Sequence, residues 1–266
     1  VNTTEEYNGT SWTSGGNLPA TVGFNTGIGT QTAAGSLGGM QGPSPGARLA
    51  TANKYDGSSW TATGSLNTAR RAAATGGSQT SGIAMGGDTP PYSNVTEEFN
   101  GSIFSNGGNL NTSRGFAGGS AATQDAAITF GGSIPPGGTT TATENYDGSS
   151  WTTSPATLSV SRYGGHMGVT APNTSTIHYG GQPAVTAATE EYNFTANTVT
   201  AAAWSNGGAL NQARRIQGNV GGKDAGLAFG GYTSSPEYLN VSEEYDGTSW
   251  TEENNLNTAR YELKGF

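Results

Sequence analysis

The feature that most constrains this chain of 266 residues is a segment that recurs six times. In five of the copies an aromatic residue is followed by Asn-Gly or Asp-Gly and by a second aromatic residue five positions later, as in "YDGTSW" at 245–250. The remaining copy carries an insertion that delays its second aromatic residue to Trp204. Successive copies begin 44 to 53 residues apart, a period typical of repeat architectures. The first aromatic residues of the six copies are Tyr7, Tyr55, Phe99, Tyr146, Tyr192 and Tyr245.

Two further anchors keep their distance from these aromatic pairs. A Leu and, four residues later, an Arg follow five of the six pairs, and the first copy has Val22 in the Arg position. A Gly-Gly pair follows 16 to 18 residues after that position, at the end of short apolar stretches such as "AITFGG". The arginines are Arg70, Arg114, Arg162, Arg214 and Arg260.

Each anchor has a local structural meaning. Asn-Gly or Asp-Gly between alternating residues predicts a β-hairpin with a type I′ turn, so the first aromatic residue ends one strand and the second begins the next. The apolar stretches predict strands with a sharp exit at Gly-Gly, where a side chain would be in the way. Small-residue segments such as "RRAAATGG" predict strands that lie where strands converge. Four short strands per repeat and no helical periodicity predict an all-β fold, a β-propeller.

The spacing also predicts the number of blades. Five complete units run through residues 22–66, 70–110, 114–158, 162–210 and 214–256 of a single domain spanning 1–266. Residues 3–18 read as the outer hairpin of another unit, and 260–266 as its innermost strand. We therefore expect six four-stranded blades, the last shared between the two ends of the chain, since closure removes exposed strand edges. That blade lacks a Gly-Gly strand, so the alternatives are a three-stranded blade or a chain that continues past Phe266.

The combination of Gly-Gly, an acidic residue with Tyr, and Trp at fixed spacing resembles the kelch motif over essentially the whole chain. The variant "YDGSSW…LNTAR…GG" is similar to kelch-like proteins of marine bacteriophages and their metagenomic relatives. The resemblance implies a virion surface, tail or fibre protein. The resemblance also suggests galactose oxidase as an enzyme candidate. The cofactor of that enzyme requires a Tyr crosslinked to Cys, so it cannot form in this chain, which has no Cys.

Composition excludes several function classes. The net charge of −8 argues against a nucleic-acid surface, which needs clustered Lys and Arg. No apolar run approaches the ~20 residues that span a bilayer, so no membrane insertion is expected. The carboxylates sit mostly at equivalent repeat positions, and no catalytic set can be assembled from them. We therefore expect that the protein is not an enzyme and that it binds neither a cofactor nor a metal ion.

The repeated arginines and the loop tyrosines are the candidate ligand-binding residues. The loops that carry the arginines open onto one face of a propeller, so Arg70, Arg114, Arg162, Arg214 and Arg260 are expected to ring one mouth and bind an anion or an acidic glycan. The alternative is that each Arg pairs with the acidic residues of its own unit. The segments after Gly-Gly differ most between units, and Tyr92, Tyr232 and Tyr238 in them are suited to stack on sugars or on partner side chains.

These observations favour a non-catalytic module on an extracellular or virion surface with a structural or adhesive role. Its expected partner is a host-surface glycan or another virion or surface protein, and display in many copies would strengthen weak contacts. The alternative is a soluble lectin with a carbohydrate site repeated in each blade. A glycan-active enzyme is a third, weaker alternative.

Overall fold

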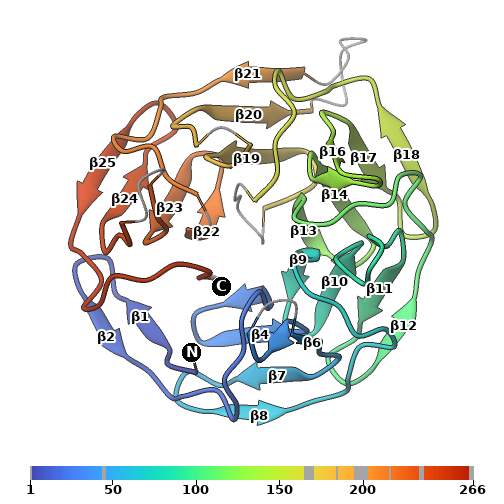
Figure 1. The fold of residues 1–266 in the computed structure, drawn as a ribbon, viewed down its shortest axis with the longest axis horizontal. Coiled ribbons are helices and arrows are strands. Elements are labelled where there is room, and N and C mark those ends of the chain that lie inside the picture. Colours follow the sequence, from blue (N-terminus) through green and yellow to red (C-terminus); the bar gives the residue numbers. More distant parts are fainter. Residues whose placement is uncertain are drawn as a thin grey trace.

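The computed structural model describes residues 2–43, 46–164, 171–183, 185–194, 203–215, 217–233 and 237–263. Their regular elements are all β-strands, and the sheets are arranged radially about a central axis (Figure 1). The fold is therefore a β-propeller, as the repeat predicts. None of the described residues belongs to a helix that is long and apolar enough to span a membrane.

Five sheets form blades, which we number 1 to 5 in chain order, and each runs from its innermost strand outward. Blade 1 contains β3 (Thr26–Thr30), β4 (Ala33–Leu37), β7 (Ala52–Tyr55) and β8 (Trp60–Ala62). Blade 2 contains β9 (Ala74–Ser78), β10 (Ser81–Met85), β11 (Thr96–Phe99) and β12 (Phe104–Asn106). Blade 3 contains β13 (Gly118–Thr123), β14 (Ala126–Phe130), β17 (Thr143–Tyr146) and β18 (Trp151–Ser154).

The last two blades follow the same order. The described strands of blade 4 are β19 (Ser175–Tyr179), β20 (Thr189–Asn193) and β21 (Ala203–Asn206), and the region of its predicted innermost strand lies largely outside the described residues. Blade 5 contains β22 (Gly218–Gly222), β23 (Ala225–Phe229), β24 (Ser242–Tyr245) and β25 (Trp250–Glu253). Short hairpins in the loops after Gly-Gly are β5 (Met40–Gln41) with β6 (Ala47–Arg48), and β15 (Ser133–Ile134) with β16 (Gly138–Thr139).

The prediction of six blades is wrong, because the described residues form five. In place of a sixth blade there is a two-stranded hairpin of β1 (Glu5–Tyr7) and β2 (Trp12–Ser14), which lies between blades 5 and 1 (Figure 1). The predicted innermost strand does not form over residues 260–263, where Glu262 adopts a left-handed φ of 60°. Residues 264–266 lie outside the described residues. With no Gly-Gly strand to bridge the two segments, only the outer hairpin of this unit is built.

The aromatic hairpins pair as the sequence predicts, but their turns do not. Tyr55 lies opposite Trp60, and the equivalent pairs recur in the other copies. In the five copies without an insertion the predicted type I′ turn is wrong, since four residues connect each pair and only the Gly has a positive φ, as at Gly57. The Asp56 carboxylate accepts the amides of Ser58 and Ser59 at 2.9 and 2.8 Å, which lowers its pKa to about 2. The Asn or Asp is therefore a side-chain cap for the turn.

The Gly-Gly pairs give the sharp exits that the sequence predicts. In blade 2 both Gly86 and Gly87 have positive φ, at 63° and 109°, directly after β10. The small residues of the innermost strands also allow close approach, because a Cβ at Gly76 of β9 would overlap the backbone of Ala121 in β13. The narrow centre of the ring therefore requires glycine and alanine.

The hydrophobic core lies between neighbouring blades. Between blades 2 and 3, Ile83 and Met85 of β10 and the repeated Leu110 pack against Tyr146 and Trp151 of the next blade. The Trp151 indole also donates to Thr96 Oγ1 at 2.9 Å. Each blade contributes two large apolar residues and a Leu to an interface that the aromatic pair of the next blade completes. This division of labour explains why the same anchors recur in each unit.

Changing Gly108 to Ala is expected to destabilise the protein by about 1–3 kcal/mol, the usual cost of overpacking. An added Cβ there would overlap the carbonyl oxygen of Ser149 in the turn of the next blade. Gly138→Ala is the matched control, because the nearest atom to its added Cβ is Ile134 Cγ1 at 3.6 Å. Thermal unfolding of the two variants checks the difference, and equal melting temperatures would contradict it.

Candidate functional site at one face of the ring

The repeated arginines lie inside the blades. Arg70, Arg114 and Arg214 are at most 1 % exposed and Arg162 is 3 % exposed. Each forms an ion pair with the Glu that lies two residues before the first aromatic residue of its own unit: Arg70 with Glu97, Arg114 with Glu144, Arg162 with Glu190, Arg214 with Glu243 and Arg260 with Glu5. The four most buried arginines therefore do not present their charge to solvent at the mouth of the channel.

The surroundings of Arg114 show what these groups do. Its Nη1 donates to the carbonyls of Gly131 at 2.9 Å and Ala142 at 3.0 Å, its Nε to the carbonyl of Thr112, and its Nη2 to Glu144 at 2.5 Å. Four of its five N–H groups are thus used within the protein. Burial lowers the pKa of the Arg114 guanidinium, and the neighbouring Glu144 opposes that shift. This geometry agrees with the alternative prediction, in which each Arg pairs with the acidic residues of its own unit.

In two units, the Glu that directly follows the paired Glu links neighbouring blades. Tyr146 of blade 3 donates its hydroxyl to Glu98 of blade 2 at 2.6 Å, and Tyr245 of blade 5 donates to Glu191 of blade 4 at 2.6 Å. Burial, followed by this hydrogen bond, raises the pKa of Tyr146 to about 12. In these two units both consecutive glutamates therefore have a structural role.

The residues that differ between units meet on one face of the ring. After the first five repeated Arg positions, the next residue pairs through its backbone with the residue after Gly-Gly, and we call these five pairs the rim. The following residue is left-handed at Phe24, Ala72, Phe116 and Gly164. The amide of Ala72 donates to the Phe24 carbonyl, and that of Phe116 to the Ala72 carbonyl, both at 2.9 Å. Hydrogen bonds between neighbouring blades thus hold the rim. Its pairs are Gly23 with Met40, Arg71 with Asp88, Gly115 with Ser133, Tyr163 with Gln182, and Arg215 with Tyr232.

A charged and aromatic cluster surrounds the Arg71 pair. Asp88 accepts from Arg71 Nε at 2.7 Å and from Arg48 Nη2 at 2.9 Å. The Arg71 guanidinium also lies 4.9 Å from the ring centre of Phe24 and 5.9 Å from that of Phe116. Tyr92 approaches Phe116 edge-on, with ring centres 6.4 Å apart. Arg71 is therefore held rigidly by an anion and two aromatic faces.

Glu262 lies near this cluster. Burial raises the pKa of its carboxyl group, and the charge of Arg71 opposes that shift. The Glu262 carboxylate in turn raises the pKa of the Tyr261 hydroxyl beside it. The rim thus combines cationic, anionic and aromatic groups within a short span.

A second group at the rim, which we call the tyrosine cluster, consists of Tyr232, Tyr238 and Tyr261. The rings of Tyr238 and Tyr261 stack at 4.7 Å with an interplanar angle of 23°, and Tyr232 meets both edge-on. Arg215 lies over the Tyr232 ring at 4.3 Å. Tyr238 and Tyr261 remain 52 % and 36 % exposed. These rigid rings offer apolar faces and hydroxyl groups to a ligand.

Of the tyrosines chosen from the sequence, the structure brings Tyr232 and Tyr238 together and places Tyr92 in the Arg71 cluster instead. Sequence reasoning missed Arg71, Phe116, Tyr163 and Tyr261. Most of them could have been found from their position in the repeat. They lie one or two residues after a repeated arginine, where the units differ from one another.

Among the residues that the structure describes, no group of three or more His, Asp or Glu is arranged to hold a metal ion. No family model matches the chain, and no curated protein matches it. Among solved structures, one entitled "Structure of YjhT" is similar to it with a TM-score of 0.74 and 13 % sequence identity. The match covers 93 % of this chain and 88 % of the other. At this identity the likeness supports the propeller fold and nothing further.

Proposed function

We propose that this propeller is a non-catalytic recognition module that binds a glycan through the rim, with the tyrosine cluster as the main contact. The observation that carries the proposal is the division between repeated and variable residues. The repeated Arg, Glu, Trp and Leu residues are mostly buried in the scaffold, whereas the residues that differ between units gather at the rim. Loops held by a rigid scaffold are where binding residues concentrate.

The tyrosine cluster has the properties of a sugar-binding surface. Tyr238 and Tyr261 present exposed, mutually supported rings, on which the apolar face of a sugar can stack while the hydroxyl groups hydrogen-bond to it. Tyrosine also loses little side-chain entropy on binding, because it has only two rotatable side-chain bonds. The cluster therefore needs no rearrangement to receive a ligand.

The setting that we propose is an extracellular or virion surface, in line with the kelch-like repeat and its similarity to phage surface and tail proteins. A single shallow site binds weakly, and display of many copies raises the effective affinity. A lectin with one site per blade is less favoured, since four of the five repeated tryptophans that would form such sites are at most 9 % exposed, and the other, Trp204, is partly buried.

The test is binding of the purified chain to a panel of glycans that includes bacterial surface polysaccharides. We expect saturable binding that Tyr238→Ala and Tyr261→Ala each weaken by about tenfold or more, as residues at the centre of an interface do. Phe194→Ala is the matched control, because Phe194 is an aromatic residue 44 % exposed directly after β20. Folding of each variant is checked by circular dichroism.

Two results would overturn the proposal. Binding that survives both tyrosine variants would move the site away from the tyrosine cluster. A panel without any saturable binding to the folded protein would favour a structural role with another virion or surface protein as partner.

A further inference from the structure

The hairpin β1–β2 leaves one strand edge without a partner. In the blades, the strand equivalent to β1 pairs with the strand that ends in Gly-Gly, as β17 pairs with β14 and β24 pairs with β23. β1 pairs with β2, and no other strand among the described residues joins this two-stranded sheet. An unpaired edge of this kind is a template for another strand.

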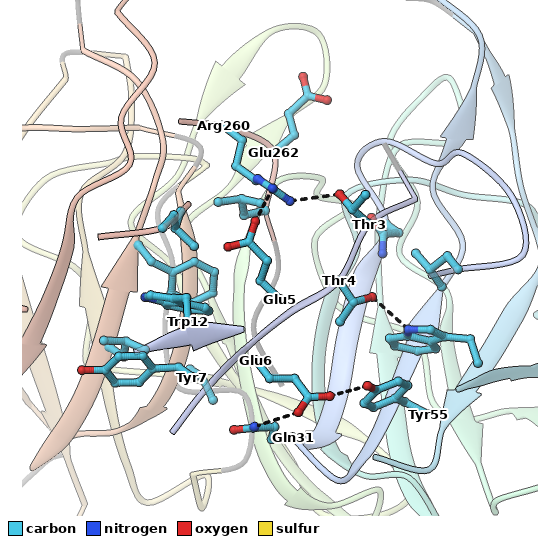
Figure 2. A pocket seen from close by; sticks show the side chains of 18 of the residues that line it. Thr3, Thr4, Glu5, Glu6, Tyr7, Trp12, Gln31, Tyr55, Arg260 and Glu262 are labelled. Carbon is cyan, nitrogen blue, oxygen red and sulfur yellow. Dashed lines mark hydrogen bonds and ion pairs between the residues drawn. The ribbon is translucent and has the colours of Figure 1, made fainter. Parts of the chain in front are cut away.

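A cavity of about 180 Å³ lies beside this edge, where the inner strands of a further blade would stand (Figure 2). Its walls come from both neighbouring blades, with Leu227 and Phe229 from blade 5 and Tyr55 and Trp60 from blade 1. Arg260 and Glu5 lie at one end of it. The cavity therefore has apolar side walls and charged groups at both ends, because Glu6 lines it beside Gln31 at the end away from Arg260 (Figure 2).

The ion pair at that end is incomplete when compared with its four counterparts. Nη1 of each counterpart arginine donates to the carbonyl of the first Gly of a Gly-Gly pair, as Arg70 does to Gly86 at 2.7 Å. Nη1 of Arg260 donates to the Thr3 hydroxyl instead (Figure 2). The Arg260 side chain is 17 % exposed, against 0–4 % for the others, and buried Glu5 Oε2 has no hydrogen-bond partner within the described part of the chain. Arg260 thus lacks the Gly carbonyl that its counterparts bind.

The hydrophobic interface on the same side is also short of residues. Between blades 3 and 4, the aromatic residues Tyr192 and Trp204 pack on Ile128 and Phe130, two large side chains of the preceding Gly-Gly strand. Among the described residues, the cluster around Tyr55 and Trp60 contains only Ala34 and Leu18 in addition. In that part of the chain, no blade supplies this interface with the two large apolar side chains that Ile128 and Phe130 supply between blades 3 and 4.

We propose that the cavity is an acceptor site for a β-strand of a partner polypeptide, which pairs with β1 in antiparallel orientation and extends the hairpin to a three-stranded sheet. The register of blade 3 gives its chemistry, since Ile128 and Phe130 of β14 lie opposite the residues equivalent to Glu6 and Thr4. The incoming strand carries two large apolar residues separated by one small residue and followed by Gly-Gly. Its apolar side chains contact Tyr55 and Trp60, and its first Gly carbonyl accepts from Arg260.

A peptide strand fits this site better than a small apolar ligand does. The edge of β1 offers backbone N–H and C=O groups, which only another backbone can match along their full length. Arg260 requires a polar acceptor at one end of the cavity, between its apolar side walls. Strand addition satisfies all of these requirements together.

The test uses a fluorescein-labelled peptide with the sequence of residues 125–133, "DAAITFGGS". We expect saturable binding to the purified chain by fluorescence anisotropy, together with a rise in melting temperature, because the peptide binds the folded state. A control peptide with Asp in place of Ile128 and Phe130 is expected to bind at least about a hundredfold more weakly, since two buried apolar anchors are lost.

Arg260→Leu in the protein is expected to weaken binding of the first peptide by about tenfold or more through loss of charge-assisted hydrogen bonds. Lys223→Met, which removes a cation that does not line the cavity, is the matched control. Equal binding of both peptides, or no saturable binding of the first, would overturn the proposal. So would a concentration-dependent dimer of the chain that the peptide does not displace, because a second copy would then occupy the site.

Discussion

Replacing Arg114 by Ala is expected to lower the free energy of unfolding by about 3–5 kcal/mol, the usual cost of removing one partner of a buried ion pair. The substitution leaves the Glu144 carboxylate, which is 1 % exposed, without its cation. It also removes donors from the carbonyls of Gly131 and Ala142, which Arg114 binds between two strands of its blade. Chemical denaturation followed by tryptophan fluorescence measures the change.

The double variant Arg114→Met, Glu144→Leu separates the charge from the packing. If the cost of the single variant comes from the stranded carboxylate, the double variant is expected to recover a large part of the lost stability. Arg260→Ala provides a graded comparison, because its side chain is 17 % exposed and water can solvate the Glu5 left behind. A loss of less than about 1 kcal/mol in Arg114→Ala would show that the pair is dispensable to the fold.

The ligand-binding hypothesis for the repeated arginines illustrates a limit of repeat analysis. A residue at the same place in each unit is used in the same way each time, but the spacing alone does not say whether it points into the blade or out of it. The pairing of Arg114 with Glu144 is also hard to recognise in the sequence. Glu144 is followed by Asn145, whereas the Glu that pairs with each of the other four arginines is followed by a second Glu.

The turn type and the number of blades were mispredicted for different physical reasons. Tyr55 and Trp60 are five residues apart, which leaves four residues for the loop, and the Asp56 side chain caps it without requiring a positive φ of its own. For the sixth unit, the aromatic pair Tyr7 and Trp12 shows that an outer hairpin forms, but no segment supplies the Gly-Gly strand. Strand pairing is non-local, so it depends on a partner that the hairpin sequence does not contain.

The rim was the part least accessible from sequence, although a signal for it exists. The backbone pairing of Arg71 with Asp88 follows from the repeat geometry, which is the same at Tyr163 and Gln182. The side chains at these positions differ from unit to unit, so no periodic pattern marks them. Once the buried anchors are assigned to the scaffold, the variable positions next to them are the ones left for recognition.

Replacing Trp151 by Ala is expected to destabilise the protein by about 3–5 kcal/mol, as large-to-small changes at buried aromatic residues do. Trp151 is 6 % exposed and packs on Ile83 and Met85 of the preceding blade, so its removal opens a cavity between two blades. Thr152→Ala is the matched control, because its side chain is exposed on the other face of the same strand and changes of that kind usually cost less than about 0.5 kcal/mol.

The chain itself contains a milder version of this change. Phe104 occupies the equivalent place in blade 2, where its ring stacks on Phe99 with centres 4.5 Å apart. Trp151→Phe is therefore expected to lose much less than Trp151→Ala, mainly the indole hydrogen bond to Thr96, worth about 1 kcal/mol. Denaturant midpoints of the three variants measure this order. If Trp151→Ala cost no more than Thr152→Ala, the interface between blades would be held by the backbone and the buried ion pairs, and the repeated tryptophans would need another explanation.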